Sequence, residues 1–330
     1  MNIAIAGAGI AGAYLYRLLS KSGNRVDIYD VPHETSCGMA PCAWGTSNGF
    51  SEIVKASGLD PDKYTLRHVD HLWIDQEKIE VALMTIDKPD LIKDLLQGAD
   101  IKYSPLEVKK YDRIIDATGL SRKFLPRIID DILVPCIQYR VQSVEHLENR
   151  IKPGGIGYAW CFPLSGNRYH IGCSSLFGDL HRIFKELGWL ETTESKSRMK
   201  IICGCESRLR LTGPHDSLPF VSDGPTEGIW GIGEAIGCVG PFAGDGIVPA
   251  MKSARILMDN WDDPDGYTKE ILKEFIWMND ERKVIDKLLK RGQLDIGDAW
   301  LLKKNSKRVG MKIGIKQAES LIKRIRLTQA

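Results

Sequence analysis

The stretch NIAIAGAGIAGAYLYRLLSKSGNRVDIYD, residues 2–30, decides the fold of this chain. Residues 2–6 (NIAIA) form an apolar run that ends in glycines, as a buried parallel strand does. Residues 13–21 place apolar side chains at helical spacing, and residues 25–30 (RVDIYD) alternate like a second strand. A strand, a glycine turn, a helix, a strand and a final acid in this order predict a Rossmann-type nucleotide-binding unit.

The glycines between the first strand and the helix each have a physical task. The first permits a tight turn, the second lets the backbone approach a pyrophosphate, and the third lets the helix pack closely on the strand. The helix N-terminus then faces the phosphates. Asp30 ends the second strand, where its carboxylate can accept hydrogen bonds from an adenosine ribose. We expect the nucleotide to be held by Gly7, Gly9, Ile10, Ala11, Gly12 and Asp30.

The composition excludes several classes of protein. The chain has 330 residues with 45 basic and 43 acidic side chains, so its net charge of +2 does not indicate binding to nucleic acid. No apolar stretch approaches the roughly 18 residues that would span a bilayer. Eight cysteines are scattered along the chain and do not form the dense framework of a small secreted domain. We therefore expect a globular protein of the cytoplasm.

Two later segments favour FAD over NAD as the nucleotide. The sequence DATG at residues 116–119 resembles the strand-end motif of FAD-dependent hydroxylase-type folds. Residues 233–237 (GEAIG), followed by residues 241–247 (PFAGDGI), resemble their second flavin motif. There an acid meets the ribityl chain, and a helix N-terminus stabilises the negative charge of the reduced flavin ring. We expect further contacts to FAD from Ala117, Gly119, Gly233, Glu234, Gly244, Asp245, Gly246 and Ile247.

The rest of the chain predicts how these motifs are arranged. Between about 134 and 212 the apolar period changes to two, and residues 158–164 and 168–174 flank the turn sequence SGN as a hairpin does. A buried strand over 229–233 and a helix over 246–260 follow. The predicted fold class is α/β: a Rossmann-type FAD-binding domain made of residues 1–133 and 213–265, an inserted antiparallel β-sheet substrate domain over 134–212, and a helical C-terminal region over 266–330.

A family resemblance becomes specific at residues 158–163 (YAWCFP), which are followed by Ile171 and Gly172. This segment resembles the tyrosine–tryptophan–phenylalanine–proline signature of geranylgeranyl reductases, flavoproteins of the para-hydroxybenzoate-hydroxylase-like superfamily. The resemblance covers roughly residues 1 to 260. It implies an FAD-dependent reductase that saturates C=C bonds of isoprenoid lipids by hydride transfer from N5 of the reduced flavin. It assigns substrate binding to Tyr158, Trp160, Phe162 and Pro163, and a catalytic role to Cys37, because the family has a cysteine–glycine pair near the flavin.

The chain also departs from the family's pattern. Glu234 stands where the second flavin motif usually has aspartate, although the longer side chain can still accept a hydrogen bond from a ribityl hydroxyl. Residues 85–91 lack the arginine that usually precedes their helix, and Lys88 is the nearby cation. The region 43–111 is shortened. The electron donor therefore stays open between NAD(P)H and ferredoxin.

Other interpretations compete with this one. The aromatic residues at 158–162 also fit the apolar core between the sheet and the nucleotide domain, and an unpaired cysteine such as Cys37 is commonly a small buried hydrophobe. The pairs Cys37/Cys42 and Cys203/Cys205 do not have the spacing of a zinc or iron–sulfur site, so we expect no metal. The alternative functions are a flavin monooxygenase acting on an aromatic or lipid substrate, and a non-catalytic, electron-carrying flavoprotein that docks a partner.

The last thirty residues are strongly basic. A basic amphipathic segment of this kind either rests on an anionic membrane surface or forms a solvated helical cap. The expected partners are thus an isoprenoid lipid, an electron-donor protein and a membrane surface contacted through residues 303–326, with no nucleic acid. Only Glu319 opposes the basic residues Lys303, Lys304, Lys307, Arg308, Lys312, Lys316, Lys323, Arg324 and Arg326.

Overall fold

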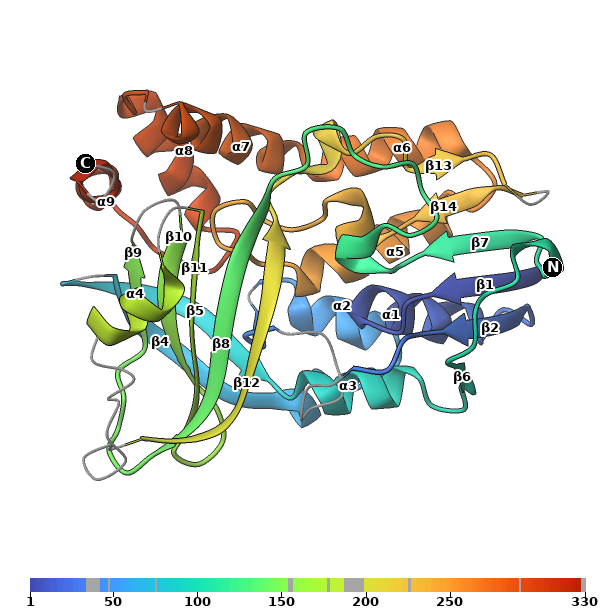
Figure 1. Cartoon of the computed structure of the whole chain (residues 1–330), viewed down its shortest axis with the longest axis horizontal. Helices are drawn as coiled ribbons and strands as arrows, with labels where there is room; N and C mark the ends of the chain where they lie inside the picture. Colours follow the sequence, from blue (N-terminus) through green and yellow to red (C-terminus); the bar gives the residue numbers. More distant parts are fainter. Residues whose placement is uncertain are drawn as a thin grey trace.

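The parallel sheet predicted from the N-terminal motif is present in the computed structural model (Figure 1). Its strand order is β13-β14-β7-β1-β2-β6, and β13 alone pairs antiparallel with its neighbour. Its first strand is apolar because it is buried between neighbours on both sides. The strands are β1 (Asn2–Ala6), β2 (Arg25–Tyr29), β6 (Ile101–Lys102), β7 (Arg113–Asp116), β13 (Val221–Ser222) and β14 (Ile229–Gly231).

The structure describes most of the chain. The described residues are 1–33, 42–46, 48–74, 76–153, 157–176, 179–186, 199–224, 227–290 and 292–327. The predicted catalytic residue Cys37 lies outside them.

Helices α1 (Ile10–Leu19), α2 (Phe50–Ala56) and α5 (Ile247–Asp259) of the nucleotide domain each begin directly after a glycine. Helix α1 starts directly after Gly9 and packs against α5 and α3 (Lys88–Leu95). The helix predicted over 246–260 is thereby confirmed as α5. Helix α2 belongs to the same part, and α6 (Pro264–Glu274) and α7 (Ile276–Leu289) follow α5 along the chain.

A larger antiparallel sheet stands beside the parallel one (Figure 1). Its order is β12-β8-β11-β10-β9-β4-β5-β3, and the predicted hairpin at residues 158–174 is confirmed as β10 and β11. Helix α4 (Leu180–Glu186) contacts β11, and Phe184 of α4 packs into an apolar cluster on one face of this sheet. The strands are β3 (Gly45–Thr46), β4 (Thr65–Ile74), β5 (Glu77–Ile86), β8 (Leu133–Ser143), β9 (Arg150–Pro153), β10 (Gly157–Pro163), β11 (Arg168–Ser175) and β12 (Met199–Arg210).

This sheet extends beyond the range expected for it. Strands β3, β4 and β5 come from residues 45–86, which the sequence analysis placed in the nucleotide domain. The β4–β5 hairpin has an apolar face formed by Val69, Leu72 and Ile79, and β4 gains a neighbour by pairing parallel with β9. A two-stranded hairpin is at best marginally stable alone, so joining a larger sheet is the stable arrangement.

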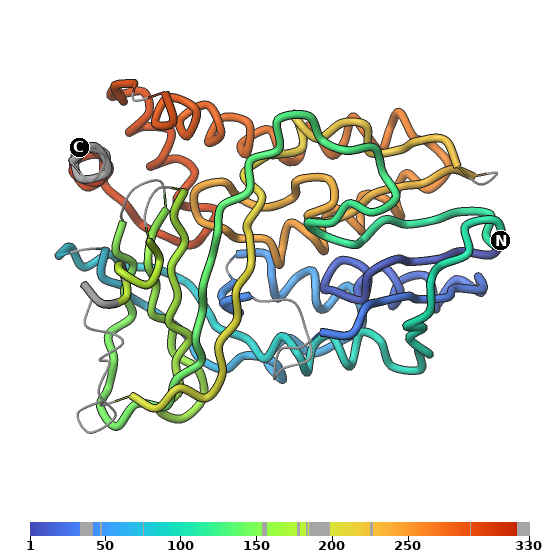
Figure 2. The backbone as a smooth tube through the Cα atoms, viewed as in Figure 1, coloured from blue at the N-terminus to red at the C-terminus, as the bar shows by residue number. Residues whose placement is uncertain are grey.

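The C-terminal region is helical, as predicted, and packs back onto the rest of the chain. It contains α8 (Ile296–Ser306) and α9 (Ile315–Leu327), and α9 lies at the opposite end of the molecule from β1 (Figure 2). The backbone of Gly310 and Lys312 is hydrogen-bonded to β5, while Ile313 and Leu321 pack on the apolar face of the β4–β5 hairpin. Much of the apolar surface of this basic region is therefore used inside the protein. None of the described helices is both long and apolar enough to cross a membrane.

Candidate functional site

The three glycines of the first motif have distinct surroundings. Gly7 has φ of +106°, and a Cβ there would lie 2.3 Å from the carbonyl oxygen of Ala117. A Cβ on Gly12 would lie 1.9 Å from the carbonyl oxygen of Gly7. A Cβ on Gly9, by contrast, would meet no atom within 4 Å. Gly7 and Gly12 are thus required by packing, whereas Gly9 leaves open space in front of the N-terminus of α1.

The strand-end motif is an internally bonded turn. The carboxylate of Asp116 is fully buried and accepts hydrogen bonds from the backbone and hydroxyl of Thr118 and from the backbone N–H groups of Phe124 and Leu125. Four donors use up its accepting capacity, so Asp116 shapes the turn and has none left for a ligand. Gly119 has φ of +61°, which favours glycine.

The second motif packs directly on the first. Gly233 begins the short helix η5 (Gly233–Ile236), and a Cβ on this residue would lie 2.8 Å from the Cβ of Ala11 and 3.6 Å from that of Ala250. The N-termini of α1 and α5 are therefore held near one another through a residue without a side chain. The structure thus brings the three predicted motifs together at one edge of the parallel sheet.

Glu234 points toward the strand-end turn. Its Oε1 accepts a hydrogen bond from the backbone N–H of Arg210 at 3.2 Å, and a Cβ on Gly119 would lie 3.8 Å from its Oε2. Burial raises the pKa of Glu234, while the N–H and the positive charge of Arg210 and the charge of Lys88 oppose this rise. The positive charge of Lys88 thus acts on Glu234, and the sequence analysis had identified Lys88 as the nearby cation.

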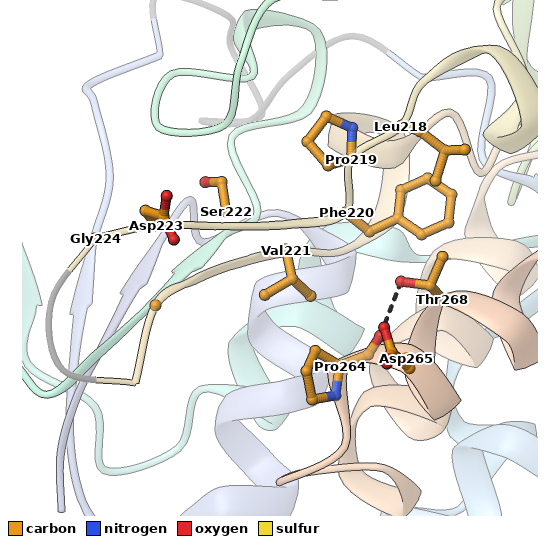
Figure 3. Close-up of a pocket in the computed structure, with 11 residues that line it drawn as sticks. Leu218, Pro219, Phe220, Val221, Ser222, Asp223, Gly224, Pro264, Asp265 and Thr268 are labelled. Atoms are coloured by element: carbon orange, nitrogen blue, oxygen red, sulfur yellow. Dashed lines mark hydrogen bonds between the residues drawn. The ribbon is translucent and has the colours of Figure 1, made fainter.

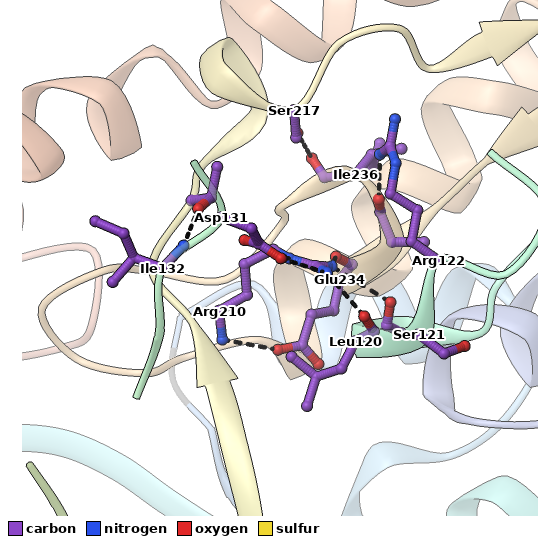
Figure 4. Close-up of polar contacts among 12 residues, drawn as sticks. Leu120, Ser121, Arg122, Asp131, Ile132, Arg210, Ser217, Glu234 and Ile236 are labelled. Atoms are coloured by element: carbon purple, nitrogen blue, oxygen red, sulfur yellow. Dashed lines mark hydrogen bonds and ion pairs between the residues drawn. The ribbon is translucent and has the colours of Figure 1, made fainter. Parts of the chain in front are cut away.

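Sequence reasoning missed the arginine that joins these motifs. Arg210, at the end of β12, is 2% exposed and forms an ion pair with Asp131. Its guanidinium also donates to the carbonyl of Glu234 at 2.5 Å and to the carbonyl of Leu120 at 2.8 Å (Figure 4). One side chain from the antiparallel sheet therefore fixes both flavin-type motifs. The signal available in the sequence was an arginine in an otherwise alternating strand, which is too weak to assign a role.

A second buried arginine performs a related task. Arg122 donates to the carbonyls of Pro126, Pro219 and Ala235. Burial lowers the pKa of Arg122 to about 10, and repulsion from Arg210 contributes to this change. Arg122 thus ties the loop after β7 to η5.

Asp30 occupies the predicted place at the end of β2. Its backbone N–H donates to Lys102, and one carboxylate oxygen accepts from the N–H of Val31 at 2.9 Å. The other oxygen lies 3.6 Å from Nε2 of His33. Gly7 donates its N–H to the carbonyl of Tyr29, which places the tip of β2 beside the glycine turn.

The aromatic segment lies on one face of the antiparallel sheet. The hydroxyl of Tyr158 donates to the carbonyl of Ala243 at 2.5 Å, beside Gly244 of the second motif. The indole of Trp160 covers Gly172, where a Cβ would lie only 2.1 Å from the ring. Phe162 approaches Gly45 at the far end of the same strand, and Pro163 accepts a hydrogen bond from Thr85. This face is therefore directed at the nucleotide domain, and the opposite face carries the cluster with Phe184.

The side chain of Asp245, a predicted cofactor-binding residue, is buried beside Gly240. Its Oδ1 is buried, has no hydrogen-bond partner among the described residues, and lies against Gly240. Glu281 of α7 is nearby and accepts a hydrogen bond from the backbone N–H of Phe242 at 3.3 Å. Burial raises the pKa of Asp245 to about 7. Burial also raises the pKa of Glu281 to about 8, helped by the negative charge of Asp245.

This carboxyl pair makes stability depend on pH. Because the folded pKa values are raised, the folded state retains protons that the unfolded state loses, and the free energy of unfolding falls as the pH rises from about 4 to about 8. The unsubstituted protein loses free energy of unfolding between pH 5 and pH 8.5, and Glu281→Gln is expected to make this loss smaller by roughly 3 kcal/mol. Urea denaturation at the two pH values measures it. Asp280→Asn, on the same helix and in an ion pair with Lys283, is the control that should behave as the unsubstituted protein. Parallel pH profiles for both variants would contradict the account.

A cavity of about 710 Å³ lies away from these motifs, between β13 and the start of α6 (Figure 3). Asp223 and Asp265 line it, and the Thr268 hydroxyl is bonded to the carbonyl of Pro264. Of the described residues that line it, none was predicted for the site and none is basic. It is therefore unsuited to a nucleotide phosphate.

The cysteines that the structure describes are all free thiols. Among the described residues no group of histidine, cysteine and acidic side chains has the arrangement of a metal site. Cys203 and Cys205, which the sequence analysis considered together, both lie on β12 and are not joined by a disulfide.

Comparison with known protein sequences found no matching family model but two informative relatives. An uncharacterised protein of Methanocaldococcus jannaschii is 24% identical over an alignment of 343 residues, which covers 86% of this chain and 91% of that protein. The digeranylgeranylglycerophospholipid reductase of Haloferax volcanii is 23% identical over 312 residues, covering 77% of this chain and 74% of the reductase.

Solved structures of flavoproteins share the fold. A geranylgeranyl bacteriochlorophyll reductase-like protein of Thermoplasma acidophilum matches with a TM-score of 0.65 and 17% identity, covering 98% of this chain and 91% of that one. A protein described as a probable FAD-dependent monooxygenase from Pseudomonas aeruginosa matches with a TM-score of 0.55 and 17% identity, over 94% and 98% of the two chains. These likenesses confirm the predicted fold and the resemblance to geranylgeranyl reductases. The fold is also shared with the probable monooxygenase.

Proposed function

We propose that this chain, which has the fold of the FAD-dependent oxidoreductases, binds FAD and reduces C=C bonds of isoprenoid lipids. The observation that carries the proposal is the convergence of three motifs. Gly7 is packed against Ala117, and Gly233 is packed against Ala11 and Ala250, so that the N-termini of α1 and α5 are held near one another.

The residues present fit the cofactor. The open space in front of Gly9 and the N-terminus of α1 suit a pyrophosphate, which would be bound by backbone N–H groups. Asp30 lies beside this turn with an accepting carboxylate for a ribose. Glu234 presents Oε2 toward Gly119, where a ribityl chain can be held. The N-terminus of α5, with Gly244, Gly246 and Ile247, would favour negative charge on a reduced flavin ring.

The antiparallel sheet supplies the other wall of the proposed site. Tyr158 anchors the sheet to the loop of Gly244, and Trp160 and Phe162 continue the same apolar face. Such a face excludes water and positions an apolar chain. Bound FAD would supply the hydride for one alkene carbon, while a proton reaches the other. The assignment of Tyr158, Trp160, Phe162 and Pro163 to substrate binding is part of this proposal.

The choice of an isoprenoid substrate rests on two supports. One is the YAWCFP segment, whose Tyr158, Trp160 and Phe162 lie on the face directed at the nucleotide domain. The other is the similarity to proteins described as a digeranylgeranylglycerophospholipid reductase and a geranylgeranyl bacteriochlorophyll reductase-like protein. The donor, NAD(P)H or ferredoxin, and a role for Cys37 belong to the same proposal.

An anaerobic spectroscopic experiment tests the function. The protein loaded with FAD and reduced by dithionite is expected to regain the visible absorption of oxidised flavin when a geranylgeranyl lipid is added, because the alkene accepts the electrons. A fully saturated analogue of the same lipid is the control and should leave the flavin reduced. Failure of the unsaturated lipid to reoxidise the flavin would overturn the proposed reaction, and failure to bind FAD would overturn the cofactor.

The monooxygenase remains a second candidate, because solved structures of that class share the fold. It predicts that the reduced protein reacts with oxygen and hydroxylates an aromatic or lipid compound, and that it does not react with the alkene under anaerobic conditions.

Contact with an anionic membrane surface through residues 303–326 is also a proposal. Its support is that Trp300 of α8 is 58% exposed and that Lys304 stacks over its ring. An exposed aromatic residue beside basic side chains is the composition of interfacial helices.

A further inference from the structure

A second cavity, of about 250 Å³, lies on the sheet face that carries the aromatic residues. It opens where the segment before α3 approaches the ends of β8 and β11. Its polar lining comes from Asp87, Arg140, Ser165 and Arg168, and Trp44 lies beside them. Two guanidinium groups thus face one acid.

Arg140 lines this cavity and forms no ion pair with any acid among the described residues. Arg140 is on β8 and lies opposite His170 of β11, and His170 lies opposite Phe162 of β10, so the three share one row across the sheet. The Nε of Arg140 is buried and has no hydrogen-bond partner in the described part of the chain. A buried donor in this condition costs free energy unless an acceptor arrives. The neighbouring ring of His170 is bound elsewhere, because its Nδ1 donates to the carbonyl of Ala43 at 3.1 Å.

Arg168 is oriented by the hairpin turn. Its Nε donates to the carbonyl of Ser165 at 3.1 Å, and its Nη2 donates to the Ser165 hydroxyl at 2.5 Å. Neither bond neutralises its charge. The acid in the cavity, Asp87, caps α3 by accepting from the backbone N–H of Asp90 at 3.1 Å. The cavity therefore keeps a net positive charge.

We propose that this cavity binds a phosphate group through Arg140 and Arg168. Guanidinium groups present paired donors that match the oxygens of phosphate, and the unpaired Nε of Arg140 would gain an acceptor. The same chemistry is offered by free inorganic phosphate and by the phosphate of a prenyl lipid.

The position of the cavity deepens the proposed function, on which this part of the inference rests. Phe162, which shares the row of Arg140, is four residues from Tyr158 on β10. A strand rises about 3.3 Å per residue, so the two rows are about 13 Å apart. A prenyl phosphate anchored at Arg140 would run past Trp160 toward the loop of Gly244. The cavity would thereby set how far from the phosphate a double bond is presented.

The test is calorimetric titration of the full chain, loaded with oxidised FAD, with inorganic phosphate. Arg140→Gln and Arg168→Gln are each expected to weaken binding by about tenfold or more, and Arg140→Lys by less, because it keeps the charge but loses the fork. Arg150→Gln is the matched control, since Arg150 lies on the same sheet in an ion pair with Glu148. Arg168 is exposed, so its variant tests the site even if substitution of the partly buried Arg140 disturbs folding.

A second titration with geranylgeranyl phosphate separates the two sources of phosphate. If geranylgeranyl phosphate competes with inorganic phosphate, the cavity is assigned to the lipid. If the two do not compete, the cavity is assigned to the free anion. Undetectable phosphate binding, or binding that both glutamine variants retain, would overturn the inference. Reoxidation of the reduced flavin of the unsubstituted protein by geranylgeraniol, which has no phosphate, reports on the proposed function separately.

Discussion

Gly9→Ala is expected to fold with the stability of the unsubstituted chain and to bind FAD roughly a hundredfold more weakly, which corresponds to about 2.7 kcal/mol. The backbone of Gly9 has φ of −67° and ψ of −175°, which alanine adopts without strain. Its Cβ would meet no protein atom within 4 Å. The methyl group would instead occupy the space through which a pyrophosphate reaches the N-terminus of α1. Flavin titration of the apoprotein and its thermal unfolding measure the two quantities.

Two other glycines provide controls for this experiment. Gly213→Ala should leave both quantities unchanged, because its Cβ would lie at an ordinary 3.7 Å from Met278. Gly12→Ala should destabilise the fold itself, since its Cβ would overlap the carbonyl of Gly7. Unchanged FAD affinity in Gly9→Ala would show that no phosphate approaches the backbone there.

Arg210→Met is expected to lower the free energy of unfolding by about 3–5 kcal/mol, the usual effect of removing one partner of a buried ion pair. The substitution leaves Asp131 unpaired and removes the donors to the carbonyls of Leu120 and Glu234. Because both motifs lose a shared anchor, FAD affinity should fall as well. Urea denaturation and flavin titration measure these effects.

The same strand offers a control for Arg210. Arg208→Met, at an exposed position of β12, should change the free energy of unfolding by less than about 0.5 kcal/mol. In Arg210→Met, the additional change Asp131→Asn should recover part of the loss, because it removes the unpaired charge. A loss below about 1 kcal/mol for Arg210→Met would show that the motifs hold their positions without the arginine.

Local sequence was sufficient for the elements whose signal lies within a few residues. The strand, turn and helix at 2–19 follow from apolar spacing and from glycines that the backbone requires. The hairpin of β10 and β11 follows from alternation around SGN. In these segments the interactions that decide the structure are between near neighbours in the chain, so the sequence displays them directly.

Contacts between residues that are distant in the chain leave no pattern in the local sequence. The pairing of β4 with β9 joins residues about 80 positions apart, which moved 45–86 from the expected nucleotide domain into the antiparallel sheet. The carboxylate of Asp245 lies against Gly240 and near Glu281, a placement that its motif does not display. A motif identifies a backbone position, and the direction of the side chain depends on what packs around it.

The sequence by itself therefore determined the α/β class, the N-terminal nucleotide unit and the three glycine-containing motifs, because apolar spacing and turn glycines are local features of the chain. Only the tertiary structure decided that Arg210 joins two of these motifs and that Arg140 and Arg168 share a cavity. The physical reason is that a buried charge has a role only through its partners, or through their absence. Those partners are brought together by folding, from positions that no local pattern connects.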